Sequence, residues 1–276
     1  MKKVSVIIPV TREKLAQKAI NSVKRQNYPG LQIIKIKAKG LNPAQARNKG
    51  AKRAKGEILL FLDDDCQAEK NWLEENLKAL ADKRIGAVGG MIRGKSKKYF
   101  SRCLDFANFT FTQKEKRCFM PVCSASLGIR RSVFKKVGGF DKNLMIGEDL
   151  DLCWRLKKMG WQTVYEPKVK VWHDHKRTSL GEVLKYQYKN GRIKGLLIEK
   201  RYADNNFWFK FLKIVGKPWL YWVFILPFAL LATAIAVVVN LKQKIFLLIP
   251  GIFLAKLACQ WGIFVWVLGQ NNRESI

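Results

Sequence analysis

The chain has 276 residues, which is enough for one large domain with a self-sufficient core and an appendage. Its 52 Lys and Arg against 21 Asp and Glu give a net charge of +31, which predicts an anionic partner such as nucleic acid or a membrane surface. The basic residues are spread over every predicted element without a recognisable RNA- or DNA-binding module, which argues against nucleic acid as the partner. The six cysteines lack the spacing of zinc ligands or redox pairs, so we expect free thiols in a reducing cytosol.

The N-terminal part of the chain alternates between strand and helix patterns. Val4–Val10 is a β-branched strand, and it is too short and too interrupted by Pro9 to be a signal peptide. A helical stripe follows at 14–26, a second strand at 31–36 and a second helix at 43–55. This succession predicts a βαβ unit, and hence a parallel sheet with a right-handed crossover.

Three consecutive carboxylates, Asp63, Asp64 and Asp65, follow a short apolar run at 57–62. Such a run predicts a strand buried on both faces, and open α/β sheets bind ligands at the carboxyl ends of their strands. An acidic cluster there suits a divalent metal ion that carries a phosphate-bearing substrate, because hard cations take oxygen ligands. The alternative is capping of a helix at 69–80, which accounts for one carboxylate but not for three.

The middle of the chain is less regular. A strand is expected at 85–92, and a short helix at 130–136 is stopped by glycines. The segment 94–117 mixes Lys, Phe and Tyr without a clear period. It is either a loop or helix that lines an acceptor site, or a solvated basic surface with a few anchoring rings.

A helix expected at 147–159 opens with acidic residues, among them Glu148 and Asp149. The helix dipole favours carboxylates in a first turn, which is sufficient to explain them. A carboxylate at this position is also well placed to point into a cleft, so both interpretations stay open.

The two histidines of the chain, His173 and His175, follow two strands expected at 164–166 and 169–172 with Pro167 between them. An isolated surface histidine is normally just solvated. Both of these lie at the end of an apolar strand beside an aspartate, and imidazole is a common metal ligand. One of them is therefore a candidate ligand.

Several short motifs occur in a fixed order and spacing between about residues 4 and 200. They are Val6-Ile7-Ile8-Pro9, Ala46-Arg47-Asn48-Lys49-Gly50, residues 56–65, Val137-Gly138-Gly139-Phe140-Asp141, residues 147–152 and Val171-Trp172-His173. Together they resemble the family-2 glycosyltransferases of GT-A fold. The resemblance implies an α/β, Rossmann-like fold with a mostly parallel central sheet and helices on both faces. It also implies a nucleotide-sugar donor, a divalent cation (Mg or Mn) and inversion at the anomeric carbon of the sugar.

The resemblance implies roles for residues at the donor site. Pro9 and Thr11, after the first strand, would line the nucleoside, and Arg47 would reach the diphosphate. Asp63 and Asp65 would hold the metal ion and the diphosphate. The chemistry asks for these residue types, because a leaving diphosphate gains negative charge that a metal ion and an arginine stabilise.

Two further roles follow from the resemblance. Asp149 would be the general base, and His173 would complete the metal site. The acceptor hydroxyl loses its proton as it attacks, so a carboxylate must lie within hydrogen-bond reach. Because the acidic cluster and Asp149 come from distant parts of the chain, they can act on opposite sides of the reacting carbon, as inversion requires.

One departure from the family lies at the end of the second strand. Relatives usually carry an Asp there that recognises the base, whereas this chain has the basic stretch 34–40 without a carboxylate. Lys37 or Lys39 either contacts phosphate or faces solvent. The departure motivates an alternative function, a catalytically inactive membrane scaffold derived from a transferase.

An apolar tail follows a basic body that contains 48 of the 52 Lys and Arg residues. The segments 218–239 and 245–268 are long enough to span a bilayer and would form a hairpin through the turn 240–244, with Trp and Tyr at the entry of the first segment. Lys256, inside the second segment, either snorkels, pairs with protein or lipid phosphate, or indicates an incomplete span. A buried helical pair in a soluble protein is the alternative.

These patterns predict a GT-A domain at 1–200, an amphipathic interfacial segment at 201–217 and two transmembrane helices at 218–269. The segment 201–217, which precedes the first predicted span, carries more positive charge than the turn 240–244 between the two spans. The positive-inside rule then gives a multi-pass cell-membrane protein with a cytoplasmic catalytic domain. A membrane-held acceptor follows as a hypothesis, such as a lipid-linked glycan or a glycolipid in cell-envelope polysaccharide synthesis.

Overall fold

The structure is a computed structural model, and the chain in it forms two compact units. The described residues are 2–109, 117–202, 221–240 and 245–271. The first unit comprises Met1–Lys95 and Thr112–His175, and the second comprises Ser96–Phe111 and Lys176–Ile276. The domain boundary predicted near residue 200 stays a prediction.

The first unit is built around one mixed sheet. Its strands are β1 (Val4–Val10), β2 (Leu31–Lys37), β3 (Ile58–Leu62), β4 (Cys66–Ala68), β5 (Ile85–Gly94), β6 (Cys118–Phe119), β7 (Ser126–Arg130) and β8 (Gln162–His173). They follow the order β2-β1-β3-β7-β5-β8-β4, with β6 paired to β8. β1 is parallel to β2 and β3, β8 is parallel to β5, and β7 runs antiparallel between β3 and β5. The predicted α/β fold with a mostly parallel sheet is confirmed.

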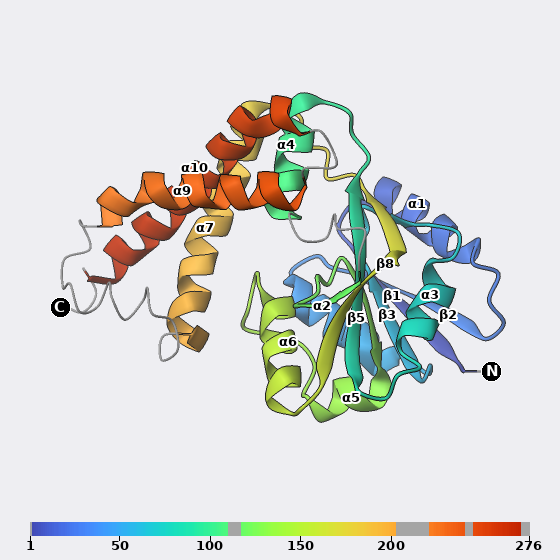
Figure 1. Ribbon diagram of the computed structural model, residues 1–276. Helices are drawn as coiled ribbons and strands as arrows, with labels where there is room; N and C mark the ends of the chain where they lie inside the picture. Colours follow the sequence, from blue (N-terminus) through green and yellow to red (C-terminus); the bar gives the residue numbers. More distant parts are fainter. Residues whose placement is uncertain (1, 110–116, 203–220, 241–244, 272–276) are drawn as a thin grey trace. The chain divides into compact units, whose positions relative to one another are not determined.

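Helices cover both faces of this sheet (Figure 1). They are α1 (Glu13–Lys24), α2 (Pro43–Arg53), α3 (Trp72–Ala79), α5 (Arg131–Lys136) and α6 (Glu148–Lys158). α1 and α3 lie on one face, and α2 and α6 lie on the other. Beneath α2, the Phe61 ring packs against the rings of Phe134 and Phe140, with centroids 5.4 and 5.2 Å apart. This core fixes β3, and the acidic residues follow directly at its end.

The helix expected from residue 69 begins only at Trp72, with Asn71 as its N-cap. The reason is that a short strand, β4, follows the acidic residues directly and pairs antiparallel with β8. The alternative in which an aspartate of the cluster caps this helix is therefore wrong.

β8 is one strand of 12 residues, whereas the sequence predicted two strands interrupted by Pro167. The pairing of β8 with β5 is irregular at this point, because it shifts between Glu166 and Lys170 on β8. Proline has no N–H to donate to a ladder, and such an irregularity is where a strand tolerates it. The single strand carries His173 to the same end of the sheet as the acidic residues.

The strand directions gather several chain segments at one edge of the sheet. Because β1, β3, β5 and β8 run in the same direction, their carboxyl ends lie at the same edge, and the antiparallel β7 begins there. The segments after Val10, Leu62 and His173, and the segment before Ser126, therefore meet. This is the edge at which open α/β sheets bind ligands.

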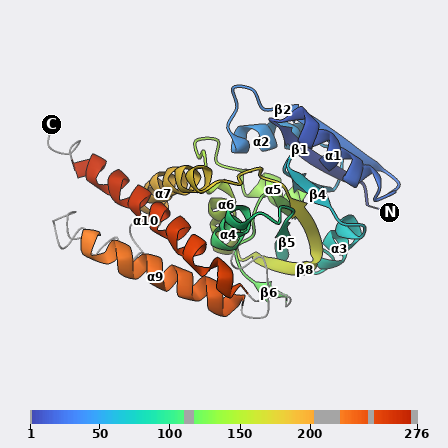
Figure 2. The ribbon, with the colours of Figure 1, turned by 90° about the horizontal axis from the view of Figure 1, so that it is seen from above.

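The second unit is helical. Its elements are α4 (Tyr99–Asn108), α7 (Leu180–Tyr202), α9 (Tyr221–Val239), the short 3-10 helix η4 (Phe246–Leu248) and α10 (Ile249–Asn271). α10 packs along α7 and lies beside α9 (Figure 2). Within the irregular segment 94–117, residues 99–108 form α4, and residues 110–116 lie outside the described part.

Lys256 of α10 is bonded within this unit. Its Nζ donates to the carbonyl oxygen of Ala107, near the C-terminal end of α4, at 2.6 Å. A lysine at a helix C-terminus is favoured by the dipole and by the carbonyl groups that lack helical partners there. Of the alternatives open from the sequence, pairing with protein is the one observed.

Phe246–Trp266 is the one helical segment in the described part of the chain that is long and apolar enough to cross a membrane. Ile225–Val239, within α9, is a shorter apolar helix. The span predicted at 218–239, and with it the hairpin, therefore stays a prediction. The predicted interfacial segment 201–217 and the turn 240–244 fall almost wholly outside the described residues.

Candidate active site

Asp64, the middle residue of the acidic turn, is bonded to the segment after β1. Its Oδ2 accepts hydrogen bonds from the N–H groups of Thr11 (2.7 Å) and Arg12 (2.8 Å) and from the Thr11 hydroxyl (2.6 Å). Its Oδ1 accepts one from the Arg12 guanidinium at 2.8 Å. Asp64 therefore ties the end of β1 to the end of β3. It also fixes Thr11, which the sequence predicted to line a nucleoside.

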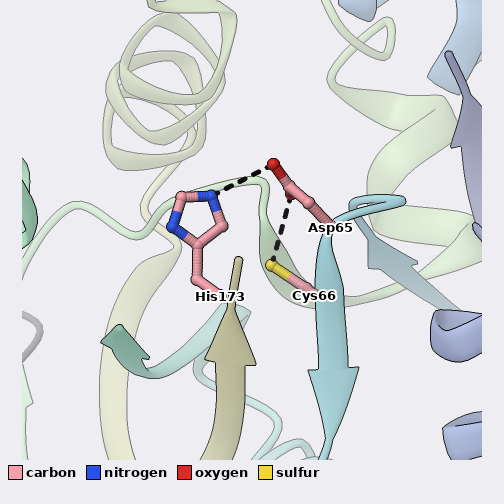
Figure 3. Close-up of side chains that lie close together, drawn as sticks. All are labelled: Asp65, Cys66 and His173. Carbon is pink, nitrogen blue, oxygen red and sulfur yellow. Dashed lines mark hydrogen bonds and ion pairs between the residues drawn. The ribbon is translucent and has the colours of Figure 1, made fainter. Parts of the chain in front are cut away.

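Asp65 and His173 point toward one another (Figure 3). They meet because Cys66 of β4 pairs with His173 of β8, and the Asp174 N–H donates to the Asp65 carbonyl oxygen at 2.8 Å. His173 Nε2 lies 3.4 Å from Asp65 Oδ2. Burial raises the pKa of Asp65, but the hydrogen bonds and charges of His173 and Arg12 outweigh burial and hold this pKa below its usual 3.8.

This group fits a hard divalent cation. Ligand atoms of Asp65, Cys66 and His173 all lie within 4.8 Å of one another. Carboxylate oxygen and imidazole nitrogen suit Mg²⁺ or Mn²⁺, and neighbouring ligands of an octahedral ion lie about 3 Å apart. Burial, followed by the nearby carboxylates, raises the pKa of the Cys66 thiol well above 9.0. Sulfur is also a soft ligand, whereas Mg²⁺ and Mn²⁺ prefer oxygen. Asp65 and His173 are therefore the side chains of this group that would hold an ion.

Arg12 lies at the same carboxylates. Its guanidinium is 2.6 Å from Asp65 Oδ2 and 2.8 Å from Asp64 Oδ1. Burial lowers the pKa of Arg12, but the two carboxylates raise it by a larger amount, so the net shift is upward and the guanidinium is always charged. A cation that binds Asp65 therefore has to share this carboxylate with Arg12 or displace it.

Arg47 of α2 bridges the acidic turn and the start of α6. Its guanidinium, in a side chain that is 4% exposed, lies 2.5 Å from Asp63 Oδ1 and 2.7 Å from Glu148 Oε1. Burial lowers the pKa of Arg47, but Asp63 and Glu148 raise it by more. The sequence predicted that Arg47 reaches a diphosphate; that role stays a prediction, and in this structure both terminal nitrogens of the guanidinium contact carboxylates, while Nε has no hydrogen-bond partner among the described residues.

Asp149 reaches the same site through the segment that precedes β7. The Ser124 N–H donates to Asp149 Oδ2 at 3.1 Å, and the Ser124 hydroxyl donates to Glu148 Oε1 at 3.0 Å. The neighbouring Ala125 accepts a hydrogen bond at its carbonyl oxygen from the Asp63 N–H at 3.2 Å. The acidic turn and the first turn of α6 are therefore attached to the same short segment.

Glu148 is a buried acid whose charge is only partly compensated. Burial first, and the charge of Asp149 second, raise the pKa of Glu148 from 4.5 to about 7, although Arg47 acts in the opposite direction. Strongly shifted pKa values that arise from burial and a specific charged neighbour cluster at functional sites. Glu148 thus belongs to this site together with Asp149.

The structure adds three residues that the sequence did not single out, Arg12, Ser124 and Glu148. The position of Arg12 could have indicated its role. It follows the first strand, and the carboxyl ends of parallel strands such as β1 and β3 lie at the same edge of the sheet, so a cation there is close to the carboxylates that follow β3. Glu148 lies in a motif, but a helix dipole was sufficient to explain it. Ser124 lies in an uncharged stretch without any signal. Pro9, which was singled out, is buried in β1 and pairs with Ile36 of β2.

Comparison with known proteins gives the same fold. Mannosyltransferase PcManGT from Pyrobaculum calidifontis, solved in complex with GDP-Man and Mn²⁺, matches with a TM-score of 0.63 and 17% identity over 96% of this chain and 88% of that chain. The pre-mycofactocin glycosyltransferase of Mycobacterium tuberculosis is 34% identical over 146 residues, which are 50% of this chain and 31% of that protein. Glycosyltransferase AglE of Haloferax volcanii is 28% identical over 225 residues, which are 68% of this chain and 72% of that protein.

This chain thus spans less than a third of the mycobacterial relative and most of the archaeal one. The family match covers the first unit, with all the residues of the site, and part of α7. Since residues 2–189 match the family described as Glycosyltransferase like family 2, the chain belongs to that family.

Proposed function

We propose that the protein is a divalent-cation-dependent glycosyltransferase. It moves a sugar, with inversion, from a nucleotide-sugar donor to a hydroxyl group of a membrane-associated acceptor. The strongest support is that the acidic turn and the first turn of α6 are attached to the same two parts of the chain. Both turns form an ion pair with Arg47, and both are hydrogen-bonded to the segment before β7. This attachment ties Asp63 and Asp149 to the edge of the sheet at which the pairing of β4 with β8 brings Asp65 close to His173.

On the donor side, Asp65 and His173 would hold the cation, and Asp63, whose Oδ1 is paired with Arg47, is retained as a further proposed ligand. When bound, the ion supplies positive charge to the diphosphate as it leaves. Pro9 and Thr11 would line the nucleoside, and Asp64 fixes Thr11 in place. The guanidinium of Arg12 adds a cation at this edge of the sheet and can donate to phosphate oxygens.

On the acceptor side, Asp149 would be the general base. A bond forms between the acceptor oxygen and the anomeric carbon while the bond from that carbon to the diphosphate oxygen breaks. The hydroxyl proton passes to the Asp149 carboxylate, and the nucleoside diphosphate leaves with the electron pair. The hydrogen bond from the Ser124 N–H orients that carboxylate for the transfer.

Asp149→Asn is expected to abolish most transfer while donor binding persists. An amide cannot take the proton, and general-base assistance contributes about 10²–10⁴ in rate. The measurement is transfer of labelled sugar from a panel of nucleotide-sugars, with donor affinity determined separately for each variant. Asp82→Asn, at an exposed ion pair with Arg84, is the matched control and should keep wild-type activity. Near wild-type transfer by Asp149→Asn removes this residue from the role.

The acceptor is proposed to be held at a membrane, as a lipid-linked glycan or glycolipid. The support comes from the second unit, where α10 is long and apolar enough to span and α9 exposes apolar side chains. When membranes containing the protein are incubated with labelled donor, label should enter the lipid extract. Label that appears only in water-soluble products contradicts this acceptor class.

A catalytically inactive scaffold is the competing function. The observation in its favour is that Lys37 and Lys39 are exposed at the end of β2. At this position the resemblance to the family implies a base-recognising aspartate, which this chain lacks. A transferase should gain thermal stability from nucleoside diphosphates when Mn²⁺ is present and lose this gain with chelator, since a ligand that binds only the folded state stabilises it. A scaffold should show no gain in either condition.

A further inference from the structure

We propose that a hollow between α2 and α5 is a second anion-binding site that takes a phosphate-bearing organic ligand. The hollow lies within the first unit, and its lining includes none of Asp63, Asp65, Asp149 and His173. It is therefore distinct from the site assigned to the donor. The inference does not depend on the proposed transferase activity.

The shape of the hollow suits a small organic ligand. Its volume is about 720 Å³, which falls within the range of ligand pockets. The floor is apolar, because it is formed by Leu59 of β3 and by Phe134 and Phe140, which are part of the core. An apolar floor below a polar rim can take the organic body of a ligand while the rim holds its charge.

The rim is strongly basic. Lys49 and Lys52 of α2, Lys135 of α5 and Lys142 of the following loop line the hollow, and all four are exposed. None of these ammonium groups has an ion pair with a carboxylate in the described part of the chain. Asp141 is the acid that lines the hollow, and one of its oxygens already accepts the N–H of Asn143.

Some lysines elsewhere in the first unit are paired with carboxylates. On α3, for example, Lys78 Nζ lies 2.8 Å from Glu74 and 3.1 Å from Glu75. Four uncompensated ammonium groups around one concave surface repel one another, and a bound anion removes this cost. Lysine acts as a point charge toward phosphate, which carries up to two charges and several acceptor oxygens. A phosphate ester is therefore the chemical class that fits both the rim and the floor.

The test measures binding of two probes to the full-length protein in a neutral detergent, with chelator present so that no divalent cation contributes. The probes are uridine monophosphate, a free phosphate ester, and dihexanoyl phosphatidylglycerol, a soluble phospholipid. Lys52→Gln/Lys135→Gln removes one ammonium group from each wall. Lys18→Gln/Lys24→Gln removes two exposed lysines of α1 and is the matched control for net charge.

We expect at least one probe to bind to the wild-type protein. The affinity for that probe should fall roughly tenfold or more in the Lys52/Lys135 variant and should stay within about twofold of wild type in the control variant. Added salt should weaken the binding. Tighter binding of the phospholipid assigns the hollow to a lipid headgroup, and tighter binding of the nucleotide assigns it to a soluble ester. Absence of binding for both probes, or equal losses in the two variants, overturns the proposal.

Discussion

Arg47 holds two parts of the candidate site together. Its guanidinium is buried between Asp63 and Glu148, which follow it in the chain by 16 and 101 residues. A buried ion pair is weak evidence for net stability, but removal of the cation leaves the buried carboxylate of Glu148 without compensation. Arg47 is therefore a positioning residue, because it sets the separation between the acidic turn and the first turn of α6.

At a pH well above 7, where Glu148 is ionised, Arg47→Ala is expected to destabilise the first unit by about 3–5 kcal/mol, since the variant leaves Glu148 as an uncompensated buried charge. At lower pH, protonation of Glu148 makes this loss smaller. The free energy of unfolding can be followed in urea by tryptophan fluorescence. Arg53→Ala, an exposed position at the end of the same helix, should change it by less than about 0.5 kcal/mol. Equal effects of the two substitutions contradict the bridging role.

Glu148 makes stability depend on pH near neutrality. Its pKa is about 7 in the folded protein and 4.5 as the ordinary value, so the folded state binds more protons between these two values. Stability due to this group therefore falls as pH rises from about 4.5 to about 7, and stays constant above that range. Glu148→Gln should flatten the profile in this window, whereas Glu57→Gln, at an exposed position, should retain the wild-type slope. The measurement is the thermal midpoint at a series of pH values.

At the scale of elements, close packing of α7 on α10 depends on glycine. A Cβ on Gly191 of α7 would lie 1.9 Å from the Cys259 carbonyl oxygen, and one on Gly262 of α10 would lie 2.1 Å from the Tyr188 carbonyl oxygen. The neighbouring atoms are backbone atoms and cannot rotate away. Small residues of this kind let helix backbones approach closely, as they do where helices associate inside membranes.

Gly262→Ala is expected to separate α7 from α10 and lower the thermal midpoint of the protein in detergent. Overpacking of this kind costs about 1–3 kcal/mol. Gly181→Ala is the control, because a Cβ on this α7 residue would have nothing within 4 Å. A midpoint for Gly262→Ala that equals that of Gly181→Ala argues against the close approach.

At the scale of the whole molecule, the chain combines a large positive charge with an exposed apolar helix. The net charge is +31. Along α9, large apolar side chains at helical spacing are between 40% and 66% exposed, and they are Val223, Leu226, Leu230, Leu231, Ile235 and Val238. A stripe of this size is unusual for a surface that faces water. Membrane insertion and electrostatic attraction to anionic lipid both follow as expectations.

Extraction of cell membranes distinguishes the two modes of attachment. High salt screens charge and should leave the protein in the membrane pellet if apolar helices are inserted, whereas a neutral detergent should release it. Release by salt alone indicates that only the basic surface binds the membrane. Leu226→Glu/Leu230→Glu, which places charges in the stripe of α9, should shift the protein toward the soluble fraction, and Lys18→Gln/Lys24→Gln should not.

Much of the fold was predictable because it depends on local periodicity. Alternating strand and helix patterns gave the parallel sheet, and the apolar run before Asp63 gave the strand that carries the acidic turn. The predictions failed where tertiary context overrides a local signal. β8 continues through Pro167 because its pairing with β5 is irregular there, and β4 exists only because it pairs with β8.

The sequence by itself determined the order of the elements, the placement of the carboxylates at a strand end and the presence of an apolar C-terminal region, because spacing along the chain encodes these properties. Only the tertiary structure decided which charge meets which partner. Asp64 bonds to the segment after β1, Asp65 faces His173, and Arg47 joins Asp63 to Glu148. These pairings depend on strand order and register, which bring together residues that no local pattern in the sequence connects.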